Sequence, residues 1–221
     1  MMLSSNQFRN AIYLDFEGEG RKHDGTVPVP HMAGLFRPNQ KGKSGKYTCT
    51  FFKQSWKPAS NGIKVAQCLT FDELFSELII ELEDNDAYLV YWTIHEYMIL
   101  NEYLNGEIFN KLAPFLYNLH SPAAKKFARK TNLFGQNTKS RTKGLEDFYS
   151  AIYPNRSTQP SLSRGPAKTC KLIDFACDRR GRWKCFSERE KNYVSELITY
   201  NEGDCRSTWL IAHKIGSYFK K

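Results

Sequence analysis

The sequence predicts a mixed α/β fold with a central sheet built mainly from the first half of the chain. Strand-like runs come first, one helix and one further strand follow, and helical patterns occupy most of the remainder. A length of 221 residues suits one domain, and 41% hydrophobic residues are enough to pack its core. We therefore expect a single domain over residues 1–221, with about five strands, the first three antiparallel, flanked by helices.

Four strands are predicted from apolar runs bounded by turn residues. The first lies within residues 11–20, before the glycines that end this stretch, and the next two cover 31–37 and 47–53. Gly, Lys and Ser at 41–45 are typical of a hairpin turn between the second and third strands. A mostly apolar and aromatic run at 87–92 predicts a buried fourth strand.

Helices are predicted from a capping box and from apolar residues at helical spacing. Thr70 and Glu73 form a capping box that begins one helix, and residues 84–86 (Asp-Asn-Asp) are expected to end it. Further elements are expected as follows: a long helical stretch through Leu100, Leu104, Leu112 and Leu116, a short helix at 145–153, a short strand at 169–174 and a last helix at 187–219.

The positive charge of the chain is concentrated in its middle. The net charge is +9, and residues 120–191 alone hold 17 Lys or Arg against 6 Asp or Glu. We interpret residues 120–190 as a basic insertion that attracts a polyanion, most commonly nucleic acid; the alternative is a solvated basic surface without a partner. The residues expected to grip phosphates are Lys125, Lys126, Arg129, Lys130, Arg179, Arg180 and Arg182.

Several classes of protein are disfavoured by the sequence. No run of 18 or more apolar residues predicts a membrane span, and the N-terminus lacks the hydrophobic core of a secretion signal. The six cysteines are scattered without a C-x-x-C pair, which favours neither a zinc site nor a disulfide framework. We expect a cytoplasmic protein with reduced cysteines.

Two carboxylates mark the end of the first strand. Side chains alternate along a strand, so Asp15 and Glu17 lie on the same face. Two like charges at this distance raise each other's pKa unless a cation lies between them. Carboxylate oxygens are the ligands that Mg²⁺ and Mn²⁺ prefer. The alternative is a half-exposed strand with a polar face.

The last helix carries a second set of polar residues. Tyr200 and Asp204 are one helical turn apart, and Asn201 and Asp204 fall within the apolar stripe of this helix. A carboxylate in a core-facing stripe is costly unless it is paired or metal-bound. Gly203, which weakens the helix by about 1 kcal/mol relative to Ala, could permit close approach of another group. The alternative places Asp204 on the helix surface.

Together these residues resemble a known family. Asp15-x-Glu17 in the first strand and Tyr200-x-x-x-Asp204 in the last helix resemble the DEDD superfamily of 3′–5′ exonucleases, in its DEDDy branch. The stretch Tyr-Asn-Glu-Gly-Asp-Cys-Arg-Ser-Thr also resembles the RNase H-like domain attached to predicted RecB-type nucleases. The resemblance implies an RNase H-like fold.

The fourth acid of the superfamily has its best match at Glu96. It follows the strand at 87–92, with Thr93 where the common pattern has Asn and Glu in place of Asp. The RecB-associated domains are similar to this arrangement. Two alternatives remain: Glu96 is an ordinary acid in the first turn of a helix, or His95 takes its place.

The resemblance implies a two-metal-ion nuclease. Asp15, Glu17, Glu96 and Asp204 would hold two Mg²⁺ or Mn²⁺ ions, and Tyr200 would orient or help to deprotonate the attacking water. The expected substrate is nucleic acid, with a single-stranded 3′ end, and no small-molecule cofactor is implied. Two alternatives remain: a catalytically weak or inactive RNase H-like module that binds nucleic acid, and a subunit whose basic face meets an acidic protein.

Overall fold

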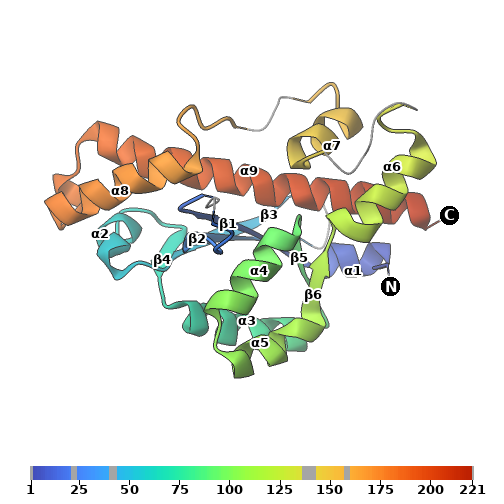
Figure 1. The fold of residues 1–221 in the computed structure, drawn as a ribbon, viewed down its shortest axis with the longest axis horizontal. Helices are drawn as coiled ribbons and strands as arrows, with labels where there is room; N and C mark the ends of the chain where they lie inside the picture. The colour runs from blue at the N-terminus through green and yellow to red at the C-terminus, as the bar shows by residue number, and fades with distance from the viewer. Residues whose placement is uncertain (1, 21–23, 40–43, 136–142, 157–159, 221) are drawn as a thin grey trace.

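A mixed six-stranded sheet forms the centre of the protein (Figure 1). The computed structural model describes residues 2–20, 24–39, 44–135, 143–156 and 160–220. The strands are β1 (Ile12–Gly18), β2 (Pro30–Pro38), β3 (Gly45–Phe51), β4 (Ala66–Cys68), β5 (Leu89–Tyr91) and β6 (Leu116–Asn118). Their order across the sheet is β4-β3-β2-β1-β5-β6.

The strand directions agree with the expected α/β fold class. β1, β2 and β3 pair antiparallel, whereas β5 pairs parallel with β1, β6 parallel with β5 and β4 parallel with β3. This mixed sheet flanked by helices is consistent with an RNase H-like fold. Of the hairpin turn predicted at 41–45, residues 41–43 lie outside the described residues.

Helices cover both faces of the sheet. The α-helices of the described chain are α1 (Ser5–Asn10), α2 (Lys57–Ser60), α3 (Phe71–Asp84), α4 (Ile94–Tyr103), α5 (Gly106–Leu112), α6 (Lys125–Thr131), α7 (Leu145–Ile152), α8 (Pro166–Arg180) and α9 (Glu188–Phe219). The predicted capping box of Thr70 and Glu73 begins α3, which ends at Asp84 as expected. The predicted helices at 145–153 and 187–219 correspond to α7 and α9.

The strand predicted at 169–174 is wrong, because these residues lie inside α8. Cys170, Ile173 and Cys177 are buried at helical spacing, and Pro166 begins the helix. The β-branched Thr169 and Ile173 favoured a strand locally, but packing against the rest of the fold decides the helix.

The long helix predicted through Leu116 is also wrong in its second half. The first helix ends before Leu104, and Asn105 starts α5 by accepting a hydrogen bond from the backbone of Glu107. Leu116 then enters β6, which pairs parallel with β5. Apolar spacing alone does not separate a short buried strand from a buried helical segment. The expected strands missed both three-residue edge strands, β4 and β6.

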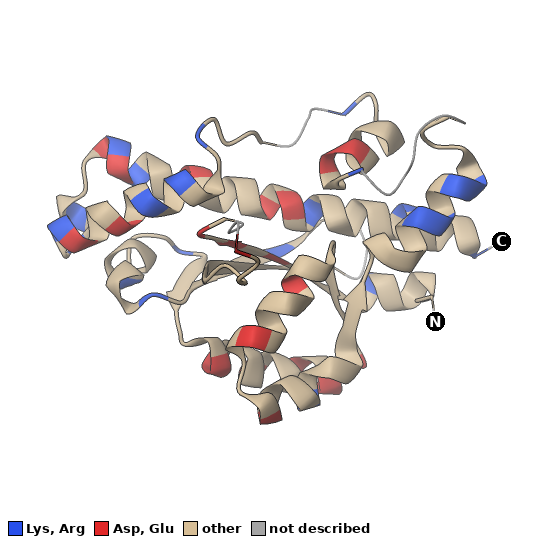
Figure 2. Cartoon of the chain, viewed as in Figure 1, with Lys and Arg blue, Asp and Glu red and all other residues tan. Residues whose placement is uncertain are grey.

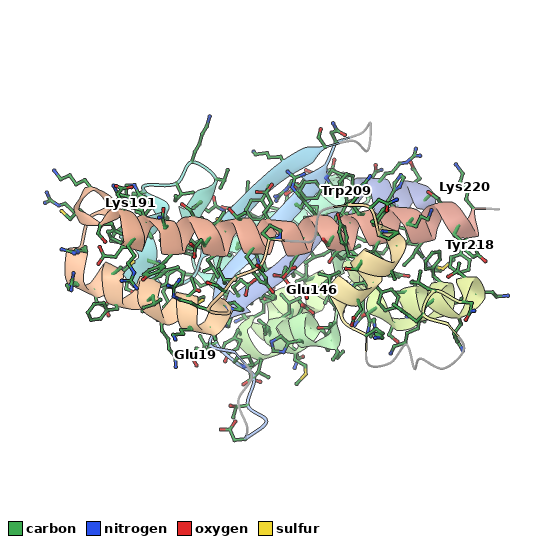
Figure 3. All side chains as sticks on the ribbon, turned by 90° about the horizontal axis from the view of Figure 1, so that it is seen from above. Glu19, Glu146, Lys191, Trp209, Tyr218 and Lys220 are labelled. Atoms are coloured by element: carbon green, nitrogen blue, oxygen red, sulfur yellow. The ribbon has the colours of Figure 1, made fainter. Side chains whose placement is uncertain are left out.

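Two hydrophobic layers hold the helices to the sheet. On one face α9 packs over Tyr13, Met32 and Phe51, and α7 and α8 flank it. On the other face α3 and α5 cover Leu14 and Leu35. Seen from above, α9 crosses the strands from Lys191 at one end to Lys220 at the other (Figure 3). None of the described helices is both long and apolar enough to cross a membrane.

A candidate metal centre between β1 and α9

Asp15 and Glu17 face α9 from the end of β1. Tyr13 on the same side of this strand belongs to the core beneath α9, whereas Ile12 and Leu14 belong to the opposite core. The alternation predicted for this strand is therefore present in the structure. Glu17 is only 5% exposed, so its carboxylate lies largely out of contact with water.

Asp204 reaches the same place from the middle of α9. One ligand oxygen from each of Asp15, Glu17 and Asp204 lies within 4.8 Å of the other two. No Lys, Arg or His forms an ion pair with any of the three carboxylates within the described part of the chain. Three carboxylates thus converge, and among the described residues none of them is paired with a cationic side chain.

Asn201 organises the carboxylates from within α9. Its Nδ2 donates to Oδ2 of Asp15 at 2.7 Å, to the backbone oxygen of Asp15 at 3.3 Å and to Oε1 of Glu17 at 3.5 Å. Its Oδ1 accepts a 2.8 Å hydrogen bond from the Tyr47 hydroxyl. Since a hydroxyl donates only to the oxygen of an amide, Tyr47 sets the orientation in which Asn201 presents its amide nitrogen to the carboxylates.

Gly34 makes room for this amide. It pairs with Asp15 across β1 and β2, and a Cβ at this position would lie 1.6 Å from Oδ1 of Asn201. Any side chain at position 34 would therefore force Asn201 out of its observed orientation. The sequence did not predict a role for Gly34, Tyr47 or Asn201. The one feature that pointed to Asn201 was its position within the apolar stripe of the last helix.

Another group lies close to Gly203, as expected from a glycine in the middle of a helix. A Cβ there would lie 2.9 Å from Cδ of Pro160, in the segment that precedes α8. This segment therefore packs directly on α9, one residue away from Asp204.

Glu96 lies at the start of α4 and is 7% exposed. Its Oε2 accepts hydrogen bonds from the backbone and hydroxyl of Thr93, at 3.0 and 2.8 Å, in a capping box. It is not part of the group of three carboxylates within 4.8 Å, although its charge raises the pKa of Asp15, Glu17 and Asp204. The structure thus brings Glu96 to the edge of the cluster, in a helix cap.

His95, the alternative to Glu96, lines a cavity of about 170 Å³ together with Glu17, Gly18, Pro28 and Pro166. The cavity opens beside the carboxylates, and His95 lies on its wall outside the carboxylate group.

Tyr200 lies one turn before Asp204 on α9 and forms a hydrogen bond with its carboxylate. Burial raises the pKa of the Tyr200 hydroxyl, and the charges of Asp204, Glu17 and Asp15 raise it further. The hydroxyl is therefore protonated at neutral pH, so that it serves as a hydrogen-bond donor.

Burial raises the pKa of each carboxyl in the cluster, and the charges of nearby acids raise it further. Burial raises the pKa of Glu17 to about 8, with a further contribution from Asp204. Burial likewise raises the pKa of Asp204 to about 7. The pKa of Asp15 rises well above its ordinary value through burial and then through the charges of Glu17 and Asp204. A bound divalent cation would relieve both effects.

The donor set fits a hard divalent cation. Oxygen ligands from carboxylates are those that Mg²⁺ and Mn²⁺ prefer, and Asp15, Glu17 and Asp204 offer three within reach of one another. Among the described residues no Lys, Arg or His is ion-paired with these three carboxylates, so their negative charges remain for such an ion.

The expected phosphate-binding residues form two separate groups. Lys126 of α6 lies over the ring of Phe219 at the C-terminal end of α9, with Nζ 5.4 Å from the centroid. Arg180 of α8 pairs with Glu190 at the other end of α9. Since α9 spans 32 residues, about 47 Å, the two groups lie at opposite ends of the molecule (Figure 2). Lys125, Arg129 and Lys130 belong to the α6 group, and Arg179 and Arg182 to the α8 group.

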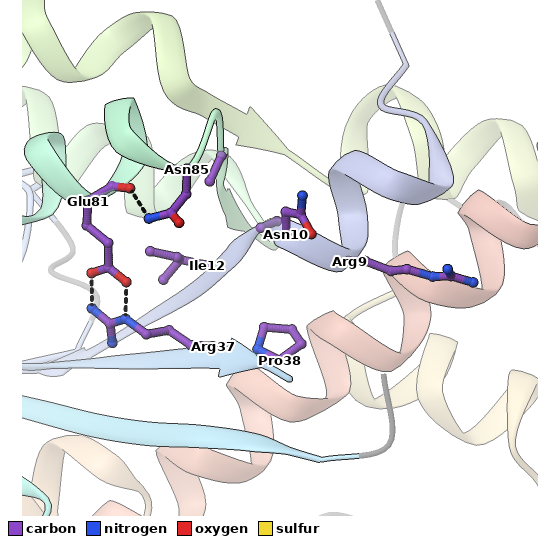
Figure 4. A pocket seen from close by; sticks show the side chains of 9 residues that line it. Arg9, Asn10, Ile12, Arg37, Pro38, Glu81 and Asn85 are labelled. Atoms are coloured by element: carbon purple, nitrogen blue, oxygen red, sulfur yellow. Dashed lines mark hydrogen bonds and ion pairs between the residues drawn. The ribbon is translucent and has the colours of Figure 1, made fainter. Parts of the chain in front are cut away.

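A second cavity of about 250 Å³ lies at the opposite end of β1, around Ile12 (Figure 4). Arg37 closes one side by donating hydrogen bonds of 2.6 and 2.7 Å to the two carboxylate oxygens of Glu81. These charges neutralise each other, and the residues around the cavity include no group of metal ligands. The carboxylates singled out from the sequence, Asp15 and Glu17, lie at the other end of this strand.

Comparison with known proteins identifies no relative of this chain. No protein-family model matches the chain, and no curated protein or solved structure is significantly similar to it. Its chemistry must be judged from the residues themselves, and what they present is a group of three carboxylates, of which Asp15 and Glu17 accept hydrogen bonds from Asn201.

Proposed function

We propose that this protein is a divalent-metal-dependent nuclease, with 3′–5′ exonuclease activity on DNA or RNA as the reaction. The observation that carries the proposal is the convergence of Asp15, Glu17 and Asp204, 4.8 Å or less apart, on a sheet consistent with an RNase H-like fold. The 3′–5′ direction rests on the resemblance of Tyr200 and Asp204 to the third motif of the DEDDy exonucleases.

Asp15, Glu17 and Asp204 would hold Mg²⁺ or Mn²⁺, with Glu96 at the edge of the group as the fourth acid. Two such ions supply an activated water and stabilise the leaving 3′ oxygen. Asn201 keeps the carboxylates of Asp15 and Glu17 turned toward the centre through its amide nitrogen. The protonated Tyr200 hydroxyl donates its hydrogen bond to Asp204, and its oxygen would accept a hydrogen bond from the attacking water and so orient it.

A cleavage assay with matched variants tests this proposal. Purified protein is incubated with Mn²⁺ or Mg²⁺ and 5′-labelled single-stranded DNA or RNA, alongside Asp15→Asn and Asp204→Asn. Glu202→Gln serves as the control, because Glu202 lies on the same helix but pairs with Arg206. We expect products shortened stepwise from the 3′ end with the wild type and the control, and none with the two cluster variants. Equal cleavage by all four proteins would reject the proposal.

One observation favours a second candidate, a nucleic-acid-binding module without efficient chemistry. Oε2 of Glu96 is engaged by Thr93, and Glu96 lies outside the group of three close carboxylates. Calorimetric titration with Mn²⁺ separates the two candidates. Heat of binding in the wild type that is lost in Asp15→Asn supports the nuclease, whereas oligonucleotide binding without any Mn²⁺ signal supports the binding module.

A further inference from the structure

The outer face of α8 carries cations and an exposed aromatic ring in one row. Lys168, Lys171, Phe175 and Arg179 follow one another at intervals of three, four and four residues, so they share a helix face. All four are exposed, and the ring of Phe175 is 61% exposed. A large apolar side chain this open to water stands out on a helix whose other hydrophobic residues are mostly buried.

The charges of this row are largely available to a ligand. Lys168 and Lys171 form no ion pair within the described ranges of the chain. The guanidinium of Arg179 lies 5.4 Å from the ring centroid of Phe175 and 3.6 Å from Oε1 of Glu190. A cation beside an open aromatic face offers both a phosphate contact and a stacking surface.

Of the two acids on α8, Asp178 is exposed beside this row of three cations, whereas Asp174 faces the other way. Asp174 accepts hydrogen bonds from Nζ of Lys53 at 2.8 Å and from the indole of Trp56 at 2.6 Å. Its charge is therefore compensated on the inner side of α8. The outer face remains net positive.

The row begins beside the candidate metal centre. Pro166, the first residue of α8, lines the cavity that contains Glu17, and the charge of Glu17 adds to burial in raising the pKa of the Cys170 thiol. The other end of this 15-residue helix lies about 21 Å away. α8 therefore runs from the carboxylates to the end of the molecule that holds Arg179, Arg180 and Arg182, whereas α6 lies at the opposite end of α9 (Figure 2).

We propose that the outer face of α8 is the track that binds single-stranded nucleic acid, with a base stacked on Phe175 and phosphates held by Lys168, Lys171 and Arg179. The inference rests on the proposed function and adds to it the path of the strand and the preference for unpaired bases. An unpaired base exposes its face to an aromatic ring, whereas the bases of a duplex are stacked on one another. Charge complementarity and the continuity of α8 with the carboxylates favour this occupant over an acidic protein.

Fluorescence anisotropy in EDTA tests the track without any cleavage. The probe is a fluorescein-labelled 12-nucleotide single strand of mixed sequence, as DNA and as RNA, with a duplex of the same length for comparison. We expect Phe175→Ala to raise the single-strand Kd roughly tenfold or more and to leave the duplex Kd unchanged, and Phe175→Trp to restore single-strand binding. Lys168→Ala/Lys171→Ala should reduce the slope of log K against log salt by about 1.4.

The matched control is Lys125→Ala/Lys126→Ala, which removes the same charge from α6. It should leave both the Kd and the salt slope near the wild-type values. An equal loss of single-strand affinity in this control would overturn the proposal. An unchanged single-strand Kd in Phe175→Ala would overturn it too, even if Lys168→Ala/Lys171→Ala weakens binding. Thermal melting of every variant checks that the fold is retained.

The two proposals fail separately. Single-strand binding that depends on α8 in a protein without nuclease activity would remove the proposed reaction and keep the track. Nuclease activity that is unchanged in the α8 variants, with an unchanged Kd, would remove the track and keep the reaction.

Discussion

The amide nitrogen of Asn201 lies 2.7 Å from Oδ2 of Asp15, and this hydrogen bond joins two residues that are 186 positions apart in the chain. The same nitrogen reaches Glu17, and Tyr47 holds the other end of the amide. Asn201 therefore couples the seating of α9 on the sheet to the geometry of the carboxylates. A neutral donor does this without contributing a positive charge that would compete with a metal ion.

Replacing Asn201 with Ala should weaken both the fold and the candidate metal centre. The change removes the donor to Asp15 and leaves the buried Tyr47 hydroxyl without its partner, which costs about 1–3 kcal/mol of unfolding free energy. Urea unfolding in EDTA measures this loss, and titration calorimetry should show weaker Mn²⁺ binding. Glu202→Ala, at the neighbouring position of α9, is the control. A stability equal to that of the control would contradict the role assigned to Asn201.

Gly34→Ala should disrupt the same contact from the sheet side. The new Cβ would lie 1.6 Å from Oδ1 of Asn201, so the amide must move away from Asp15. We expect a lower Tm and loss of Mn²⁺-dependent cleavage. Gly106→Ala, where a Cβ meets nothing within 4 Å, should leave both properties intact. Normal cleavage by Gly34→Ala would show that Asn201 does not need its observed orientation.

In EDTA, the stability of the protein should fall as the pH rises toward 8. The pKa of Glu17 is raised from 4.5 to about 8, and that of Asp204 from 3.8 to about 7. A carboxyl with a raised pKa in the folded state stabilises the fold below its unfolded pKa, and that contribution disappears as the pH passes the folded value. The window therefore runs from about pH 4 to pH 8.

Thermal melts at intervals of half a pH unit measure this dependence. Asp15→Asn should flatten it by removing one of the carboxyls whose pKa is raised in the folded state, and Mn²⁺ should reverse it because the ion binds the deprotonated carboxylates. A Tm that rises through this window without metal would contradict the raised pKa values.

Glu96→Gln should show whether Glu96 contributes to metal binding in addition to capping α4. Glutamine also serves in a capping box, so the Tm should change little. Mn²⁺ affinity should fall, because the charge of Glu96 acts on Asp15 and Glu17. Glu96→Ala loses the hydrogen bonds to Thr93 as well and should be about 1 kcal/mol less stable. Unchanged Mn²⁺ binding in Glu96→Gln would restrict Glu96 to its structural role.

Tyr200→Phe should slow cleavage while preserving the shape of its pH profile. The raised pKa of Tyr200 keeps the hydroxyl protonated, so it orients rather than accepts a proton. Loss of one preorganised donor lowers the rate by about 10²-fold. Single-turnover rates between pH 6 and pH 9 measure this effect. A limb of the profile that disappears in the variant would assign Tyr200 as the base.

The sequence predicted the elements that carry the candidate site. Alternation in β1 placed Asp15 and Glu17 on one face, and the apolar stripe of α9 placed Asp204 toward the core. These predictions depend on the spacing of apolar and polar residues along the chain, which repeats every few residues. Short elements were less predictable: β4 and β6 have three residues each, and α8 contains β-branched residues that favour a strand locally.

Local pattern by itself therefore determined that the chain forms a mixed α/β fold with acids at the end of its first strand and in its last helix. Only the tertiary structure decided that Asn201, with Tyr47 and Gly34 beside it, holds Asp15 and Glu17 in place, and that the basic segment divides between two ends of α9. The physical reason is distance along the chain. The hydrogen bonds of Asn201 to Tyr47 and Asp15 join residues 154 and 186 positions apart. Such contacts depend on how helices pack on the sheet, which no local periodicity specifies.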